Sequence, residues 1–177
     1  PYCTISGWHG VTTVVIGNCG FGFAPVRPEE RERAMMRMTR NEAIEYDVMA
    51  STMPWDWVSF PELMDSLARL PLGVNVTSLC PIAPLMLWVL GEDRRYEEPT
   101  PPEVKEMQRL LHVAMDAGAC GFSIQKLGFD SVQPDFDGGP MPTDVMSDEL
   151  ILAFADVLGE RGDGWIQITY APFEVEK

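Results

Sequence analysis

The sequence predicts an α/β fold built on a parallel β-sheet. Four short runs rich in β-branched residues alternate along the chain with longer stretches of helical periodicity. Two of the helical stretches open with a Ser/Thr-x-x-Glu capping pattern, which marks where a helix begins. Strands that alternate with helices are typical of parallel strands joined by right-handed crossovers.

The first strand and its helices come from residues 10–70. Residues 10–16 are nearly continuous in β-formers, as expected for a strand that is buried on both faces. A loop rich in glycine and proline follows, and residues 29–38 then form a helix with a proline in its first turn. The capping pattern of Ser59 and Glu62 opens a second helix, whose leucines repeat at helical spacing before Pro71 ends it.

The remaining elements repeat this order. Thr100 and Glu103 form the second capping pattern, and Gly118 closes the helix that follows. The loop after the third strand contains Asp135 and two adjacent glycines, and we expect it to lie outside the core because it is so polar. The predicted elements are a strand at 73–79, a helix at 100–117, a strand at 120–124, a loop at 126–146, a helix at 147–160 and a strand at 165–169.

Two parallel folds fit this order of elements, an open doubly wound sheet and a (β/α)8 barrel. No G-x-G-x-x-G follows the first strand and no P-loop lysine is present, which disfavours a nucleotide-binding sheet. No helix is predicted after the last strand to cover it. A complete (β/α)8 barrel needs about 250 residues. We therefore predict that residues 1–177 form a single partial TIM-barrel domain, an interior piece of a barrel.

The composition excludes some classes of binding partner. The 177 residues carry 13 Lys+Arg and 27 Asp+Glu, a net charge of −14, which would repel nucleic acid and an anionic membrane surface. Prolines interrupt the longest apolar run, so no membrane span is expected. The four cysteines are too widely spaced for a zinc ribbon or a disulfide framework, and reduced thiols predict a cytoplasmic location. The oligomeric state is not indicated.

Candidate site residues follow the strands, because catalytic groups in a barrel lie at the C-terminal ends of strands. Gly17-Asn18-Cys19-Gly20 follows the first strand, and its glycines would let the backbone bring a thiolate close to a metal or substrate. A thiolate is a strong zinc ligand. The alternative for Cys19 is a small buried thiol in a turn, and residue type alone favours that alternative.

The other strand ends offer fewer reactive groups. Ile82 and Met86 follow the second strand and would form an apolar pocket wall. Ser123 and Gln125 follow the third strand and offer hydrogen bonds, while the acidic loop beyond them would either cover a ligand or be a solvated connection.

The two histidines, His9 and His112, lie away from strand ends, so structural roles are expected for both. A catalytic zinc site usually needs three protein ligands, and this chain supplies at most one good candidate, Cys19.

Several motifs resemble those of a known family. The stretch at 9–20, HGVTTVVIGNCG, together with FAPVRP at 23–28, resembles the second-strand signature of the N-acyl-D-amino-acid deacylases, a branch of the amidohydrolase superfamily. Weaker matches are WVSFPE at 57–62, GVNV at 73–76 and AMDAGACGFS at 114–123. The resemblance runs from the first residues to about Ser123, with a weaker echo to Thr169.

This resemblance implies a metal-dependent hydrolase on a TIM barrel that cleaves an amide C–N bond with a metal-activated water. The chain would be about strands two to five of that barrel. Cys19 would be a zinc ligand, while the first pair of histidine ligands and the base aspartate would lie outside the chain, leaving it inactive by itself. An N-acyl amino acid is the implied small-molecule substrate. Ser123, Gln125 and Met86 are the candidate substrate-binding residues.

Two departures keep an alternative open. Many deacylases carry a histidine and an arginine after the third barrel strand, where this chain has an apolar stretch at 81–86. A histidine is also expected on the fifth barrel strand, where residues 166–170 contain none. The alternative is a non-catalytic or metal-altered barrel that binds a small apolar ligand. A third hypothesis is a self-contained open-sheet binding domain.

Overall fold

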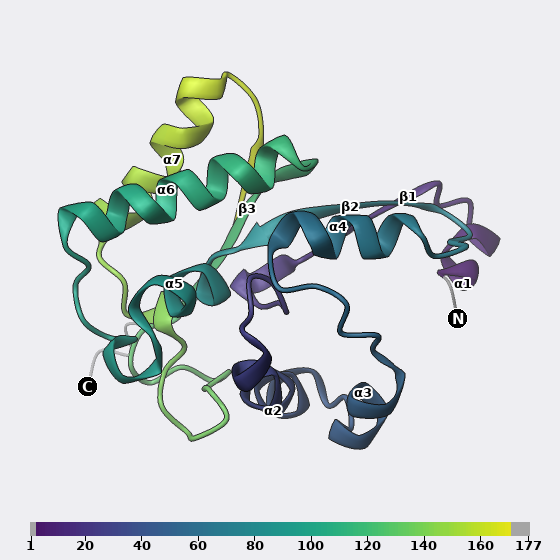
Figure 1. Cartoon of the computed structure of the whole chain (residues 1–177), viewed down its shortest axis with the longest axis horizontal. Coiled ribbons are helices and arrows are strands. Elements are labelled where there is room, and N and C mark those ends of the chain that lie inside the picture. The colour runs from purple at the N-terminus through teal and green to yellow at the C-terminus, as the bar shows by residue number, and fades with distance from the viewer. Residues whose placement is uncertain (1–2, 171–177) are drawn as a thin grey trace.

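The computed structural model describes residues 3–170, in which four parallel strands form one sheet (Figure 1). The strands are β1 (Thr13–Ile16), β2 (Asn75–Pro81), β3 (Ala119–Lys126) and β4 (Trp165–Tyr170), and they lie side by side in sequence order. A doubly wound sheet reverses its strand order partway, whereas a (β/α)8 barrel does not. The sheet is therefore half of a barrel, which confirms the predicted partial TIM barrel.

Three crossover helices connect the strands. They are α4 (Phe60–Ala68), α6 (Pro101–Asp116) and α7 (Asp148–Arg161), and α6 packs against both of the others. Both predicted capping boxes are present, at Ser59 with Glu62 and at Thr100 with Glu103. These local signals explain why the helix starts could be predicted from the sequence within one residue.

Further helices lie in the loops that follow the strands. The helix predicted at 29–38 begins as η2 (Pro28–Glu30) and continues as α2 (Arg31–Glu42). Figure 1 shows α2 and α3 well away from the crossover helices α6 and α7. The remaining elements, none of which was predicted from the sequence, are α1 (Thr4–Trp8), η1 (Asn18–Gly20), α3 (Tyr46–Thr52), α5 (Ile82–Leu90), η3 (Glu92–Arg94) and η4 (Pro142–Asp144).

The main core lies between the sheet and the crossover helices. Phe122 of β3 and Phe154 of α7 are fully buried with ring centroids 5.9 Å apart. Trp57 and Phe60 are also buried in this cluster, which supports packing rather than ligand stacking as the role of the aromatic segment before α4. Most of α5 joins the same cluster, including Ile82 and Met86.

The expectation that the loop at 126–146 lies outside the core is wrong for part of it. Asp135 and Thr143 are fully buried, and Met141 and Asp144 are each 1% exposed. The carboxylates are buried because each has partners: Asp135 pairs with Arg37, and Asp144 accepts several hydrogen bonds.

The two edge strands of the described sheet leave apolar side chains exposed. On β4, Trp165, Ile166 and Ile168 are all exposed. Val15 and Ile16 on β1 are exposed too, so the expectation that the first strand is buried on both faces is wrong for the described chain, in which β1 is an edge strand. Among the described residues, the helices are too short or too polar to cross a bilayer.

Candidate active site

The segment after β1 crosses the C-terminal end of the sheet. Within it, η1 contacts β2, β3 and β4. Gly17 and Gly20 both have positive φ, and a Cβ on Gly17 would lie 2.4 Å from the carbonyl oxygen of Leu79. A Cβ on Gly20 would lie 3.1 Å from the Cα of Ile124. The two glycines therefore allow the backbone on either side of Cys19 to lie directly against its neighbouring strands.

Two hydrogen bonds hold Cys19 of η1 against β4, and a third joins its two partners to each other. Its backbone N–H donates to Oε1 of Gln167 at 2.6 Å, and its Sγ accepts from Oγ1 of Thr169 at 3.1 Å. Nε2 of Gln167 donates to Oγ1 of Thr169 at 3.0 Å, so the three residues form a closed ring of hydrogen bonds. We call these three residues the Cys19 ring. Cys19 has a φ of 60° and remains partly exposed, so its sulfur is oriented without being enclosed.

Ser123 is fully buried beneath the same segment. Its hydroxyl donates to the carbonyl oxygen of Gly17 and accepts from the N–H of Gly20 at 3.0 Å. Both hydrogen-bonding functions of Ser123 thus serve to hold the Cys19 loop. Contact between Ser123 and a substrate stays a prediction.

Gln125 holds the long loop after β3. It is fully buried, and its Nε2 donates to Oδ2 of Asp144 at 3.0 Å, the carbonyl of Gln133 at 3.2 Å and Oγ of Ser131 at 3.3 Å. Its Oε1 has no hydrogen-bond partner among the described residues. Asp144 also accepts from the N–H of Leu127 at 2.9 Å. Burial raises the pKa of Asp144, and these hydrogen bonds offset only part of that rise.

Met86 lies in the core, with 2% of its surface exposed. Its neighbours in α5, Ala83, Pro84 and Leu87, line a cavity beside α2, but the room in that cavity for water-sized molecules is only ≈ 30 Å³. A cavity of this size holds about one water molecule. The structure thus brings Ser123 close to Cys19 and places Met86 elsewhere, and substrate contact by Gln125 or Met86 stays a prediction.

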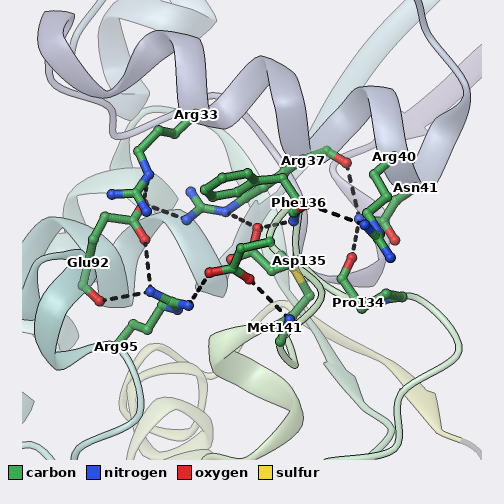
Figure 2. Close-up of polar contacts among 12 residues, drawn as sticks. Arg33, Arg37, Arg40, Asn41, Glu92, Arg95, Pro134, Asp135, Phe136 and Met141 are labelled. Atoms are coloured by element: carbon green, nitrogen blue, oxygen red, sulfur yellow. Dashed lines mark hydrogen bonds and ion pairs between the residues drawn. The ribbon is translucent and has the colours of Figure 1, made fainter.

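A second polar cluster joins the loops after β1, β2 and β3, as Figure 2 shows. Arg37 of α2 donates from Nε to Oδ1 of Asp135 at 2.7 Å, and its Nη2 donates to the carboxylate of Glu92. Asp135 is fully buried, and the side chains of Arg37 and Glu92 are each 10% exposed. Burial opposes the charge of Arg37, but the two carboxylates outweigh it and raise the pKa of Arg37. We call these three residues the Arg37 clasp.

Further charges surround the clasp. Arg95 contacts Oδ2 of Asp137 at 2.5 Å, and Nε of Arg33 lies 3.9 Å from the carboxylate of Glu92. The ring of Phe136 lies beside the guanidinium of Arg33, with 5.0 Å between the guanidinium carbon and the ring centroid. Three arginines therefore face three carboxylates, and the cluster is electrically balanced.

The residues around Cys19 do not complete a zinc site. Across residues 3–170, no three His, Cys, Asp or Glu side chains lie close enough to hold a metal ion. The groups that touch Cys19 are a carboxamide and a hydroxyl, whereas zinc prefers thiolate, imidazole and carboxylate. Burial raises the pKa of Cys80 to about 12, so Cys80 stays a neutral thiol. Cys19 is the suitable ligand here, and other ligands would have to come from outside the described residues.

Sequence reasoning found Cys19 but missed its partners on β4. The signal was present, because residues 165–169 read W-I-Q-I-T, in which Gln167 and Thr169 alternate with two isoleucines. Two polar side chains two residues apart on a strand face the same side. No comparable pattern of neighbouring residues in the sequence indicates the Arg37 clasp.

Comparisons with known proteins identify what this region resembles. The chain is 35% identical over 160 residues to uncharacterized proteins of Mycobacterium tuberculosis and Mycobacterium bovis, covering 87% of this chain and 26% of theirs. It is 30% identical over 115 residues to an N-acyl-D-aspartate deacylase of Alcaligenes xylosoxydans xylosoxydans, covering 65% of this chain and 20% of that protein. The chain thus spans about a quarter of the length of these relatives. No protein-family model matches it.

Solved structures share the fold. An N-acyl-D-glutamate deacylase from Bordetella bronchiseptica, complexed with zinc and a phosphonate inhibitor, superimposes with a TM-score of 0.67 at 24% identity. The match covers 95% of this chain and 30% of that one. A D-aminoacylase described as defining a subset of amidohydrolases superimposes with a TM-score of 0.63 at 25% identity, covering 93% of this chain and 29% of that one.

Proposed function

The chain is an N-acyl-D-amino-acid deacylase-like amidohydrolase region that corresponds to part of those proteins, and from this premise we propose that it belongs to a metal-dependent hydrolase of amide C–N bonds. The observation that carries the proposal is the position of Cys19. Its sulfur lies at the C-terminal end of β1, at the end of the barrel where reacting groups gather.

Within this proposal, Cys19 would supply one thiolate to a zinc ion. A zinc ion bound there would polarise an amide carbonyl and lower the pKa of a bound water. Gly17 and Gly20 let the loop lie close to the strands, and Ser123 fixes that loop from below. The proposed substrate is a small N-acyl amino acid, and the base aspartate is proposed to lie outside this chain.

Zinc content of the whole protein tests the role of Cys19. We expect Cys19→Ser to lose most of the bound zinc and the hydrolysis of N-acyl-D-amino acids, because serine is a much weaker zinc ligand than a thiolate. Cys3→Ser is the matched control, since Cys3 precedes α1 and does not follow the C-terminal end of a strand. Equal zinc content and activity in Cys19→Ser and the wild type would overturn the proposal.

A second candidate function is a metal-altered barrel that binds a small apolar ligand without turnover. It is favoured by the lack of histidine on β4 and by a groove of ≈ 530 Å³ beside β1 and α4, lined largely by apolar side chains such as Phe21, Trp57 and Leu67. Hydrolysis of an N-acyl amino acid by the zinc-loaded whole protein would refute this candidate.

A cytoplasmic location is also proposed. Cys3, Cys19, Cys80 and Cys120 are all free thiols, as expected for a reducing compartment.

A further inference from the structure

We propose that Gln167 and Thr169 are positioning residues that fix the direction of the Cys19 sulfur, and that neither of them is a metal ligand. This inference rests on the proposed role of Cys19 and extends it to the neighbouring strand. In this inference, residues of β4 orient a ligand that lies in η1, the segment after β1.

The strand register places both residues on the face where Cys19 lies. Gln167 pairs with Ser123 and Thr169 pairs with Gln125 in the parallel ladder of β3 and β4. Side chains two residues apart on a strand share a face, so the four polar residues lie on one side of the sheet. Ser123 contacts the Cys19 loop directly, which identifies this as the side that the loop covers.

The hydrogen bonds of the Cys19 ring run in one direction. The N–H of Cys19 donates to Gln167, Gln167 donates to Thr169, and Thr169 donates to the sulfur of Cys19. A threonine hydroxyl has one proton to donate, and here the hydroxyl oxygen already accepts from Gln167. Its proton is therefore directed at the sulfur. A hydrogen bond to a thiolate favours a fixed position for the sulfur and leaves its remaining lone pairs free for a metal.

The chemistry of the two β4 side chains argues against direct metal binding. A neutral hydroxyl and a carboxamide are not among the usual ligands of zinc in proteins, which are thiolate, imidazole and carboxylate. Both side chains also have their polar groups engaged with the ring, since Oε1 and Nε2 of Gln167 each have a partner. Groups of this kind behave as outer partners that orient a ligand.

A spectroscopic experiment on the whole protein loaded with Co²⁺ tests the inference. The thiolate-to-cobalt charge-transfer band reports on the sulfur itself, independently of catalytic activity. We expect Thr169→Val to shift this band and to weaken Co²⁺ binding by about tenfold, the usual effect of losing an outer partner. Thr169→Ser keeps the hydroxyl and should restore both. Gln167→Leu, which removes the other two bonds of the ring, should also shift the band.

A control and two contrary outcomes separate this inference from the proposed function. Thr39→Val removes a hydroxyl whose hydrogen bond goes to Met35 of the same helix, and it should leave the band unchanged. If Cys19→Ser abolishes the band while Thr169→Val leaves band and affinity unaltered, the positioning role is wrong and the proposed function stands. Equal losses in Thr169→Ser and Thr169→Val would also overturn it. A band that survives in Cys19→Ser would refute the proposed function instead.

Discussion

The Arg37 clasp and the Cys19 ring both hold loops at the C-terminal end of the sheet, but they do so with different chemistry. The clasp joins one cation to two carboxylates, and Asp135 within it is fully buried. The ring joins a thiol, a hydroxyl and a carboxamide that all remain partly exposed. Removing Arg37 from the clasp leaves the buried Asp135 without its cation, whereas removing one member of the ring leaves neutral groups that water can reach.

The clasp therefore maintains the architecture, whereas the ring can change with little loss of stability. The clasp sets the relative positions of three loops, so it must be kept whole. Altering the ring should cost little stability, because its groups are neutral and partly exposed. Changes to each cluster should therefore affect different observables, stability for the clasp and the properties of the sulfur for the ring.

The largest expected effect comes from Arg37→Ala. Removing this guanidinium leaves the fully buried Asp135 without its cation, and breaking a buried ion pair from one side lowers the free energy of unfolding by about 3 to 5 kcal/mol. Urea denaturation measures the change. Arg109→Ala breaks an exposed pair with Glu106 and should lower it by less than about 1 kcal/mol. Similar losses in the two variants would show that the clasp is no more than a surface ion pair.

The next effect is expected at Gln125. Gln125→Leu removes the donor that reaches Asp144 at 3.0 Å, and hydrogen bonds to charged groups contribute about 1.5 to 3 kcal/mol. Gln108→Leu is the matched control, because Gln108 donates only to the neutral carbonyl of Ala153. Denaturation of both variants should show the larger loss for Gln125→Leu, and the reverse order would contradict the role of Gln125 as the anchor of the loop.

A pH dependence should follow from Asp144. Its pKa is raised in the folded state, so the folded chain binds more protons than the unfolded chain between the ordinary pKa and the raised one. The stability that this group contributes is therefore present at low pH and is lost as the pH rises through the folded pKa. The unfolding free energy of the wild type should therefore fall relative to that of Asp144→Asn as the pH rises from about pH 4. Denaturation of both proteins at a series of pH values measures this. A difference that grows in favour of the wild type with rising pH would contradict this assignment.

The smallest effect on stability is expected in the ring. Thr169→Val removes two neutral, partly exposed hydrogen bonds, and it should lower the free energy of unfolding by only about 1 kcal/mol because water can reach the groups left behind. The same variant is expected to change the cobalt spectrum, whereas Arg37→Ala is expected to lower stability and to leave that spectrum unaltered. A loss in Thr169→Val as large as that in Arg37→Ala would erase the distinction between the two clusters.

Much of the fold could be predicted because its signals are local. Ser59 with Glu62 and Thr100 with Glu103 mark helix starts through contacts three residues apart. The helix α5 was missed because Pro81 and Pro84 interrupt its apolar run. Pro84 nevertheless lies in the first turn, where the backbone N–H has no helical partner to lose.

The site could be predicted only where one short segment carried it. Cys19 stands out through the glycines on either side, whereas its partners Gln167 and Thr169 are 148 and 150 residues further along the chain. Asp135 was expected in a solvated loop because its partner Arg37 is 98 residues away. Pairings of this kind depend on tertiary structure and leave no periodic pattern in the sequence.

The Arg37 clasp also limits how this end of the molecule can be redesigned. Arg37, Glu92 and Asp135 come from the loops that follow three successive strands, so those loops meet at one shared guanidinium. If one of these loops were replaced by the loop of a related protein, one member of the clasp would be lost. The charges on the other two loops would then no longer be balanced. The three loops therefore form a single module for engineering and should be exchanged together.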